Sequence, residues 1–170
     1  MTLTVEWRNG NSVLPEHSLM LIAFPGVGNV GKAAIDAVNS VNEATQVARL
    51  YDTSLPPLAC LDEDGLLAPP HYTLSSIESS TGKVVLTLTG STQPVDPNSQ
   101  GMLANEIMKF FMEQGVSELV VMAGLGSEPS RKETFIVASN SSHRIELESR
   151  GVDVRRDEPS SGAIGLSALL

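Results

Sequence analysis

The pattern of hydrophobic and polar residues switches between the period of a strand and the period of a helix early in the chain. Leu19–Phe24 is continuously apolar, as in a strand that helices cover on both faces. The next residues predict a helix, because apolar positions recur at helical spacing. Its predicted buried stripe is Val30, Ala34, Ala37, Val38 and Val41, and Lys32, Asp36 and Asn39 are predicted to point away. Thr45–Tyr51 then returns as a strand, which completes a predicted βαβ unit with a right-handed crossover.

Further strands are predicted on both sides of this unit, from alternating or short apolar runs. They cover Thr2–Trp7, Tyr72–Ile77, Lys83–Thr89, Glu118–Ala123, Glu133–Ser139 and Val152–Val154. The pairs Pro56-Pro57 and Pro69-Pro70 exclude a helix from Asp52–Pro70, because proline removes a backbone donor and fixes φ. That segment is therefore predicted to be an ordered loop or a pair of edge strands.

The helix with the clearest boundary signals begins after Asp96. This residue is a typical N-cap, Pro97 takes the first helical position, and Gly115 follows the end. The predicted buried stripe of the helix is Leu103, Ile107, Phe110 and Phe111. A shorter helix is predicted at His143–Arg150, where Gly151 stops it.

The last predicted helix is short and apolar. Ser160 or Ser161 caps it, and its apolar residues run to the end of the sequence. These residues are Ile164, Leu166, Leu169 and Leu170. Because isolated helices of this length are marginal, two explanations stay open. Either the sequence is a fragment of a longer natural chain, truncated at its C-terminus, or a true terminus is tucked into the core.

Composition places these elements in a single α/β domain of residues 1–170. The 170 residues are 41% hydrophobic and 18% charged, which is typical of a folded globular protein with a substantial core. Cys60 is the only cysteine, so no intrachain disulfide can form. The sequence contains neither an apolar run that would span a bilayer nor a secretion signal at its start. We therefore expect a cytoplasmic protein.

The charge of the chain argues against nucleic acid and membranes as partners. Lys and Arg number 11 against 20 Asp and Glu, giving a formal net charge of −9 that repels phosphate backbones and anionic lipids. The candidate basic patches are the pairs Arg131-Lys132 and Arg155-Arg156. Two adjacent basic residues usually mark a solvated loop, and we expect that here.

A glycine-rich loop, Gly26-Val27-Gly28-Asn29-Val30-Gly31, joins the first apolar strand to its helix. With Asp52 at the end of the next strand, it has the layout of a dinucleotide-binding fingerprint, with Gly26, Gly28, Gly31 and Asp52 as cofactor-binding residues. Three observations weigh against that interpretation. Pro25 stiffens the turn, the proline-containing segment after Asp52 does not continue as a nucleotide fold, and no second domain would hold a substrate. The alternative is that the glycines permit tight packing, with no cofactor bound.

The loops after Phe24, Thr89 and Ala123 gain interest from their position. If the three preceding strands are parallel, all three loops lie at the carboxyl edge of the sheet, where α/β proteins place ligands. We expect this edge to form an interface or a vestigial site, with loop-shaping residues and no catalytic residue. These residues are Gly26, Gly28, Asn29, Gly31, Gly90, Gly124 and Gly126.

No other residues form a recognisable catalytic or metal site. His17, His71 and His143 are scattered, without a carboxylate or cysteine at metal-ligand spacing. Cys60 has no basic neighbour that would activate its thiol, and Asp62–Asp64 is expected to be a solvated acidic turn.

Two enzyme classes also lack their signatures. Ser127 after Gly124-Leu125-Gly126 does not form the nucleophile elbow of hydrolases. Arg49 and Arg131 follow no pattern of a phosphate site, which disfavours a phosphorylase.

Several landmarks occur together in the order found in one known family. They are Phe24 to Gly31, Asp52 with Leu55-Pro56-Pro57, Asp64-Gly65 followed by Pro69, Gly90-Ser91-Thr92-Gln93-Pro94, Gly124-Leu125-Gly126 and Ser161 to Leu166. In this combination, from Leu19 to Leu170, the chain resembles the proteasome-assembly-chaperone family, which includes archaeal homologues of the second eukaryotic chaperone.

This resemblance implies a three-layer α/β/α sandwich with a mainly parallel mixed sheet, akin to nucleoside phosphorylases but without their catalytic machinery. It also implies homo-oligomers and, for some members, binding to proteasome α-subunits. Members that dock on the proteasome use a C-terminal hydrophobic-Tyr-any tail. Here the sequence ends in Ala168-Leu169-Leu170, so docking through such a tail is not expected if this is the natural end.

The predicted function is a non-enzymatic protein-binding subunit, a chaperone that self-associates and acts in proteasome assembly. The alternative is a dinucleotide-binding domain of an oxidoreductase, and a third interpretation is a phosphorylase-like enzyme.

Overall fold

The computed structural model describes residues 3–62, 64–126, 133–157, 159 and 163–170. The chain divides into two compact units, of which the first comprises Met1–Gly124 with Ile164–Leu170 and the second Leu125–Ala163. Among the described residues, no helix is long and apolar enough to cross a membrane.

The first unit is built on a mixed six-stranded sheet with the order β1-β3-β6-β7-β2-β8. The strands are β1 (Thr4–Trp7), β2 (Leu19–Ala23), β3 (Thr45–Tyr51), β6 (Tyr72–Glu78), β7 (Val84–Gly90) and β8 (Leu119–Val121). β2 pairs in parallel with β7 and β8, whereas the pairs β1–β3, β3–β6 and β6–β7 are antiparallel. Four strands, β2, β3, β7 and β8, therefore run in the same direction. The predicted α/β fold with a mixed sheet is confirmed.

The predicted strand–helix–strand unit exists, but its two strands are not neighbours. β2 leads through helix α1 (Val30–Val41) to β3, and strands β7 and β6 lie between them in the sheet. The reason is the hairpin β6–β7, whose seven residue pairs from Tyr72↔Gly90 to Glu78↔Val84 fill the space in between. β7, which comes later in the chain, thus takes the place beside β2 that β3 would have in a simple strand–helix–strand unit.

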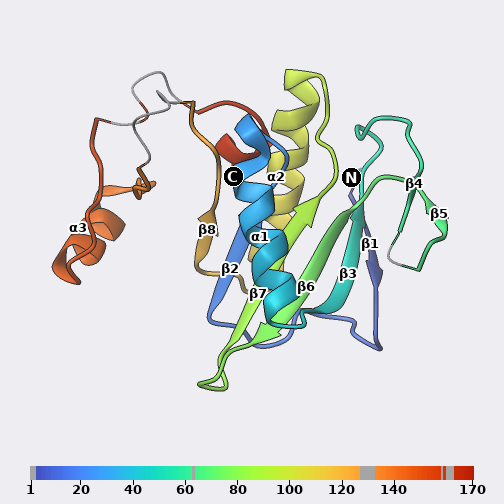
Figure 1. Ribbon diagram of the computed structural model, residues 1–170, viewed down its shortest axis with the longest axis horizontal. Helices are drawn as coiled ribbons and strands as arrows, with labels where there is room; N and C mark the ends of the chain where they lie inside the picture. Colours follow the sequence, from blue (N-terminus) through green and yellow to red (C-terminus); the bar gives the residue numbers. More distant parts are fainter. Residues whose placement is uncertain (1–2, 63, 127–132, 158, 160–162) are drawn as a thin grey trace. The chain divides into compact units, whose positions relative to one another are not determined.

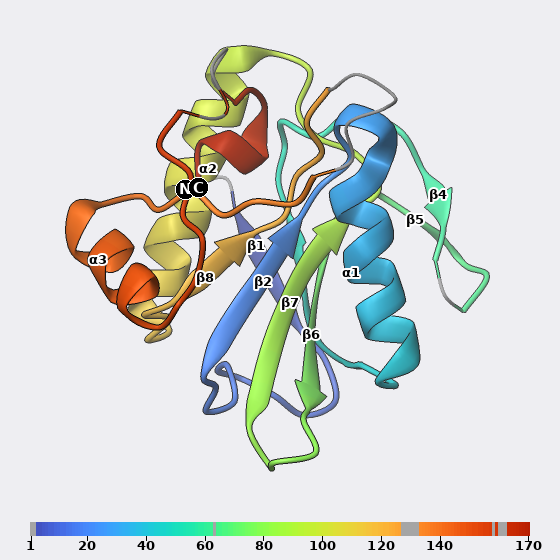
Figure 2. The same ribbon diagram turned by 60° about the vertical axis from the view of Figure 1, so that its left-hand side comes forward.

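Two helices cover opposite faces of the sheet, α1 on one side and α2 (Pro97–Glu113) on the other (Figures 1 and 2). Met20, Ile22 and Leu88 face α2 and belong to the main core cluster. On the α1 face, Thr87 Oγ1 donates a hydrogen bond of 2.8 Å to Asn39 Oδ1. The three-layer arrangement agrees with the architecture expected from the resemblance.

Helix α1 buries a different face from the one predicted. Its buried residues are Gly31 and Ile35, and Asn39 turns toward the sheet rather than away from it. Val30 and Val41, predicted to be buried, are 61% and 81% exposed. The buried face follows Gly31, whose backbone lies against Met122 and Ala123 just after β8, and Ile35 one turn later, which the predicted stripe passed over. A hydrophobic pattern does not register a residue without a side chain.

Helix α2 matches its prediction closely. The side chain of Asp96 accepts hydrogen bonds from the backbone N–H groups of Asn98 and Ser99, and Gly115 follows the helix with φ +79°. Hydrogen bonds from the Ser99 hydroxyl and from these N–H groups hold the pKa of Asp96 below its usual value. The predicted stripe of Leu103, Ile107, Phe110 and Phe111 is buried.

A small antiparallel sheet, β4 (Cys60–Leu61) and β5 (Leu67–Ala68), stands apart from the main sheet (Figure 1). Of the two predicted alternatives, an ordered loop or a pair of edge strands, the structure has two short strands that pair with each other. The prediction of a solvated acidic turn is wrong for Asp62, because Asp62 Oδ2 lies 3.1 Å from Arg49 Nη2 and both side chains are only 5% exposed. The residues around Asp62 in the sequence do not indicate this ion pair, because its partner Arg49 lies on β3.

The second unit contains helix α3 (Ser141–Ser149), which Asn140 caps by accepting a hydrogen bond of 2.8 Å from the His143 N–H. The strands predicted at Glu133–Ser139 and Val152–Val154 are reduced to one parallel bridge between Ile136 and Val154.

The last predicted helix is a single 3-10 turn, η2 (Leu166–Ala168), which belongs to the first unit. The predicted caps Ser160 and Ser161 lie outside the described residues. Of the apolar residues in this segment, Leu166 is fully buried in the main core cluster and Leu170 packs against it, whereas Ile164 is 88% and Leu169 52% exposed.

Candidate functional site

The carboxyl edge of the sheet gathers the loops that the sequence singled out. Because β2, β7 and β8 are parallel, the segments that follow Ala23, Gly90 and Val121 all leave the sheet at this edge. Gly26, Gly28, Asn29, Gly31, Gly90 and Gly124 therefore lie on neighbouring segments of the first unit. Gly126 belongs to the second unit, and nothing lies within 4 Å of the position that a Cβ would take there.

Two of these glycines permit direct contact between backbones. A Cβ on Gly31 would lie 2.2 Å from the carbonyl oxygen of Met122, and one on Gly124 would lie 2.2 Å from the carbonyl oxygen of Val27. Neither carbonyl can move aside as a flexible side chain would. The start of α1 and the segment after β8 are thus packed against each other without room for side chains, so these glycines serve the close packing of the edge.

Two other residues shape the loop itself. Gly28 has φ +61° and Asn29 has φ +52°, and both follow the extended Gly26 in a short 3-10 turn, η1 (Val27–Asn29). Glycine and asparagine are the residues that adopt this left-handed conformation most readily. The turn leaves residues 26–30 exposed. The predicted loop-shaping role therefore has a defined geometry at these two positions.

Gln93 links three segments at this edge, a role the sequence did not reveal. Its Nε2 donates a hydrogen bond to the carbonyl oxygen of Pro25, and its Oε1 accepts one of 2.8 Å from the N–H of Leu166. These partners lie 68 and 73 residues away in the sequence. Because no local spacing connects residues so far apart, only the fold could identify Gln93 as the residue that ties the glycine loop to the terminal segment.

Tyr72 is a fully buried residue at the same edge of the sheet. The Cδ1 atom of its ring lies 2.3 Å from the position that a Cβ on Gly90 would take. The ring also packs against Phe24, with the ring centroids 4.6 Å apart. Within the described part of the chain its buried hydroxyl has no hydrogen-bond partner. Burial, together with the charge of Asp52, raises the pKa of Tyr72 well above its usual value, so the hydroxyl stays protonated.

Asp52 does not lie where a dinucleotide-binding fingerprint requires it. It follows β3, which is separated from β2 and the glycine loop by β7 and β6. Its Oδ1 accepts hydrogen bonds from the N–H of Ser54 at 2.8 Å and from the Ser54 hydroxyl, which fixes its own loop. The adjacent strands that would let one dinucleotide reach both the glycines and the acid are absent from the described sheet.

Asp52 instead lines a cavity of about 250 Å³ near the beginning of α2. The other lining residues are Thr53, Ser54, Ser99, Met102 and Leu103. Asp52, Thr53, Ser54 and Ser99 give the cavity polar groups, and Met102 and Leu103 give it apolar ones.

The remaining candidate residues are held by ordinary structural contacts. The Nδ1 atoms of His17 and His71 lie 2.8 and 2.9 Å from the carbonyl oxygens of Pro15 and Pro69. Since a carbonyl only accepts, each Nδ1 is the donor. Cys60 is a partly exposed free thiol on β4. Within the residues that the structure describes, no group of three His, Cys, Asp or Glu side chains could hold a metal ion.

The basic pair of the second unit is neutralised by acids. Arg155 lies 3.4 Å from Glu133 and 3.6 Å from Asp153, and Arg156 lies 2.7 Å from Glu148. These ion pairs reduce the positive charge available to a phosphate backbone, in agreement with the interpretation of Arg155-Arg156 as a solvated segment. Arg131-Lys132 and Ser127 lie outside the described residues.

Comparison with solved structures identifies relatives of this fold. The structure is similar to PbaB from Pyrococcus furiosus, an archaeal proteasome activator, with a TM-score of 0.78 and 22% identity over 99% of this chain and 72% of that one. It is also similar to PbaA from the same organism, an archaeal homologue of a proteasome-assembly chaperone. That match has a TM-score of 0.71 and 22% identity, and covers 100% of this chain and 66% of PbaA.

Comparison with curated sequences gives an archaeal relative. The chain is 23% identical over 155 residues to the uncharacterized protein MJ1210 of Methanocaldococcus jannaschii, a match that covers 91% of this chain. The chain spans 59% of the length of that relative. The model of the PAC2 family matches residues 20–170, which include the whole glycine-lined edge and all the landmarks that follow it. The chain is a member of the PAC2 family.

Proposed function

We propose that this protein is a non-enzymatic binding subunit that acts as a proteasome assembly chaperone in the cytoplasm. It self-associates and holds proteasome α-subunits by burying complementary surface. The observation that carries this proposal is membership of the PAC2 family over residues 20–170, together with a fold that matches PbaB and PbaA along nearly the whole chain.

The geometry of the carboxyl edge supports a binding role rather than catalysis. In an enzyme of this fold class, the edge would hold a ligand in an open crevice. Here Gly31 and Gly124 place backbone against backbone, and Gln93 ties the loops together. Between the glycine loop and the segment after β8, the edge is thus filled by backbone, which suits contact with another protein better than the enclosure of a substrate.

Light scattering coupled to size-exclusion chromatography tests the proposal. The protein is run alone and then mixed with purified proteasome α-subunits from the same organism, with an unrelated acidic protein as a control. We expect a defined homo-oligomer of the 18.0-kDa chain that moves into a larger complex with α-subunits but not with the control. A protein that stays unshifted at micromolar concentrations of both components would contradict the proposed partner.

A further inference from the structure

The cavity of about 250 Å³ beside the beginning of α2 brings together two segments that are distant in sequence, and we call it the α2 cavity. Residues 52–54 follow β3, and Ser99, Met102 and Leu103 lie on α2. Because residues three and four positions apart share one face of a helix, these three side chains face the same way, toward residues 52–54. Leu103 is buried and forms the inner side of the cavity, whereas Thr53 and Met102 are exposed and lie at its rim. The cavity is therefore open to solvent.

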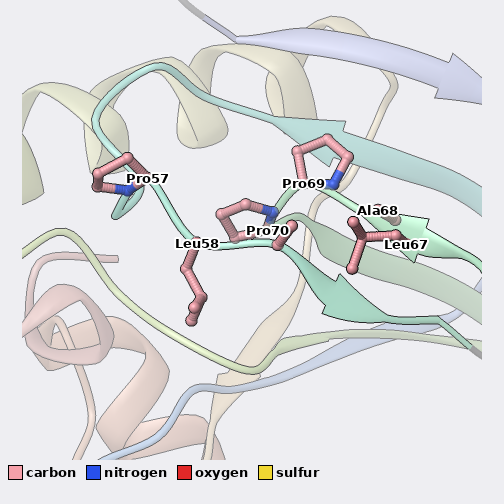
Figure 3. Close-up of a pocket in the computed structure, with 7 residues that line it drawn as sticks. Pro57, Leu58, Leu67, Ala68, Pro69 and Pro70 are labelled. Carbon is pink, nitrogen blue, oxygen red and sulfur yellow. The ribbon is translucent and has the colours of Figure 1, made fainter.

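A second hollow, in the segment that carries β4 and β5, has a different lining (Figure 3). Its volume is about 360 Å³, and its lining side chains are those of proline, leucine and alanine. Such side chains carry no charge and neither donate nor accept hydrogen bonds, so they do not select a ligand of particular chemistry. The α2 cavity, in contrast, has polar groups that can select one.

Two serine hydroxyls of the α2 cavity already donate their hydrogens to carboxylates. The Ser54 hydroxyl donates to Asp52 Oδ1, and the Ser99 hydroxyl donates to Asp96 Oδ2 at 2.6 Å. The direction is fixed because an ionised carboxylate only accepts hydrogen bonds. Each serine oxygen therefore offers only its lone pairs to a molecule in the cavity. Since a hydroxyl that donates to an anion becomes a better acceptor, both oxygens favour a donor that carries positive charge.

The charges around the α2 cavity also favour a cation. Asp52 lines the cavity, and Asp96 lies one hydrogen bond beyond Ser99. The positive end of the α2 dipole would oppose a cation, but Asp96 accepts hydrogen bonds from the N–H groups of Asn98 and Ser99 and offsets it. The formal net charge of −9 attracts cations from solution. Because no metal-binding group of three His, Cys, Asp or Glu side chains occurs in the described ranges, the cation that fits is an organic one.

We propose that the α2 cavity binds a primary alkylammonium group. The ammonium donates hydrogen bonds to the oxygens of Ser54 and Ser99, and its methylene stem lies against Met102 and Leu103. Three donors on one nitrogen suit acceptors that come from separate residues. A guanidinium fits less well, because its fork binds both oxygens of one carboxylate, and Asp52 Oδ1 already accepts two hydrogen bonds from Ser54. The inference does not rest on the proposed function.

A titration of the isotope-labelled protein with n-butylammonium, followed by amide chemical shifts, tests the proposal. Butyltrimethylammonium is the matched control, since it has the same stem and the same charge but no N–H donor. We expect saturable shifts at residues 52–54 and 99–103 with butylammonium, and binding at least about tenfold weaker with the control. Equal affinity for the two cations, or no saturable shift at these residues up to about 100 mM butylammonium, would overturn the proposal.

Substitutions of the two hydroxyls test their role as acceptors. Ser54→Ala and Ser99→Ala, made singly, each remove one hydroxyl and keep the backbone N–H groups that bind Asp52 and Asp96. We expect each to weaken butylammonium binding roughly tenfold, whereas Ser40→Ala, at an exposed position near the end of α1, leaves it unchanged. An amide spectrum that is unchanged away from the cavity shows that each variant is folded. Full affinity in either cavity variant, or the same loss in the control, would contradict the proposal.

Competition with proteasome α-subunits assigns the source of the ammonium group. Displacement of butylammonium when the complex forms supports the site with a lysine side chain of the partner as its occupant. A complex that leaves butylammonium bound supports the site with a free amine as its ligand. Because the titrations above use the protein alone, failure to form a complex would contradict the proposed function and leave their result on the ammonium site unchanged.

Discussion

The carboxyl edge of the sheet and residues 55–70, the arm that carries β4 and β5, differ in what their residues contact. At the edge, Gly31 and Gly124 remove side chains so that backbones touch, and Gln93 ties the segments together. In the arm, Leu61 and Leu67 are presented to solvent on two short strands. At the edge, the packing excludes any added side chain, whereas the arm leaves large apolar side chains in contact with solvent. Substitutions at the edge should therefore affect folding, whereas those of the exposed leucines in the arm should leave the stability of the fold nearly unchanged.

The largest effect is expected at Gly31. Its replacement by alanine improves intrinsic helix propensity, but the new Cβ would lie 2.2 Å from a backbone carbonyl of Met122. We expect the free energy of unfolding to fall by at least about 2 kcal/mol, since neither backbone can relax cheaply. Chemical denaturation measures this change.

Gly101 provides the matched control, because it lies inside α2 with nothing within 4 Å of its Cβ position. The same substitution there should raise the free energy of unfolding by about 0.5–1 kcal/mol. If Gly31→Ala also stabilised the protein, the close contact at the edge would be refuted.

The next largest effect is expected when Gln93 is replaced by alanine. Its two hydrogen bonds, to Pro25 and from Leu166, would be lost together, which should cost about 2 kcal/mol of stability. Gln100→Ala is the control, because the side chain of Gln100 donates one hydrogen bond, to the Pro94 carbonyl six residues away. Hydrogen exchange should show increased opening of the terminal segment in the Gln93 variant only, and equal behaviour of the two variants would argue against a linking role.

A pH-dependent effect is expected in the arm at Asp62. Its pKa is lowered from 3.8, first by the N–H of Leu66 and then by Arg49 and the N–H of Asp64, all of which favour the ionised carboxylate. Ionised Asp62 therefore stabilises the fold above about pH 4, and this contribution is lost as the pH falls further.

Asp62→Asn should accordingly lower the thermal midpoint at pH 7, with the difference from wild type shrinking below pH 4. Asp64→Asn serves as the control, since Asp64 is exposed. A midpoint difference that did not depend on pH would show that the loss arises from packing rather than from the charge of Asp62.

The smallest effect on stability is expected at the exposed leucines. Leu61→Ser and Leu67→Ser should each change the free energy of unfolding by no more than about 0.5 kcal/mol in dilute solution, because both side chains lie mainly in solvent. Urea denaturation at low protein concentration measures this. A loss comparable to that of Gly31→Ala would mean that the arm is part of the core, and the contrast between the two regions would fail.

The two main helices show how far sequence patterns reach. Helix α2 was predicted with its cap at Asp96, its end at Gly115 and its buried stripe, because all these signals are local. Helix α1 was predicted at the right place but with the wrong face buried, since the decisive residue is Gly31. Its contact is with Met122, which follows a strand that lies far along the chain.

The candidate site divides in the same way. The glycine loop and its parallel neighbours were found from the sequence, because strand–loop–helix patterns are visible within a few residues. Gln93, Tyr72 and the buried Asp62 were not, since their partners are distant in sequence and a polar residue in a loop is most often solvated.

Local sequence was enough to predict the α/β class, the boundaries of α2, the positions of strands β6 and β7, and the family landmarks. Each depends on local periodicity, caps or turns, which are properties of a few consecutive residues. Only the folded structure shows the strand order, the buried face of α1, the links made by Gln93 and the separation of Asp52 from the glycine loop by two intervening strands. These features depend on contacts between segments that are distant along the chain, and such contacts are set by packing and steric exclusion in the folded protein.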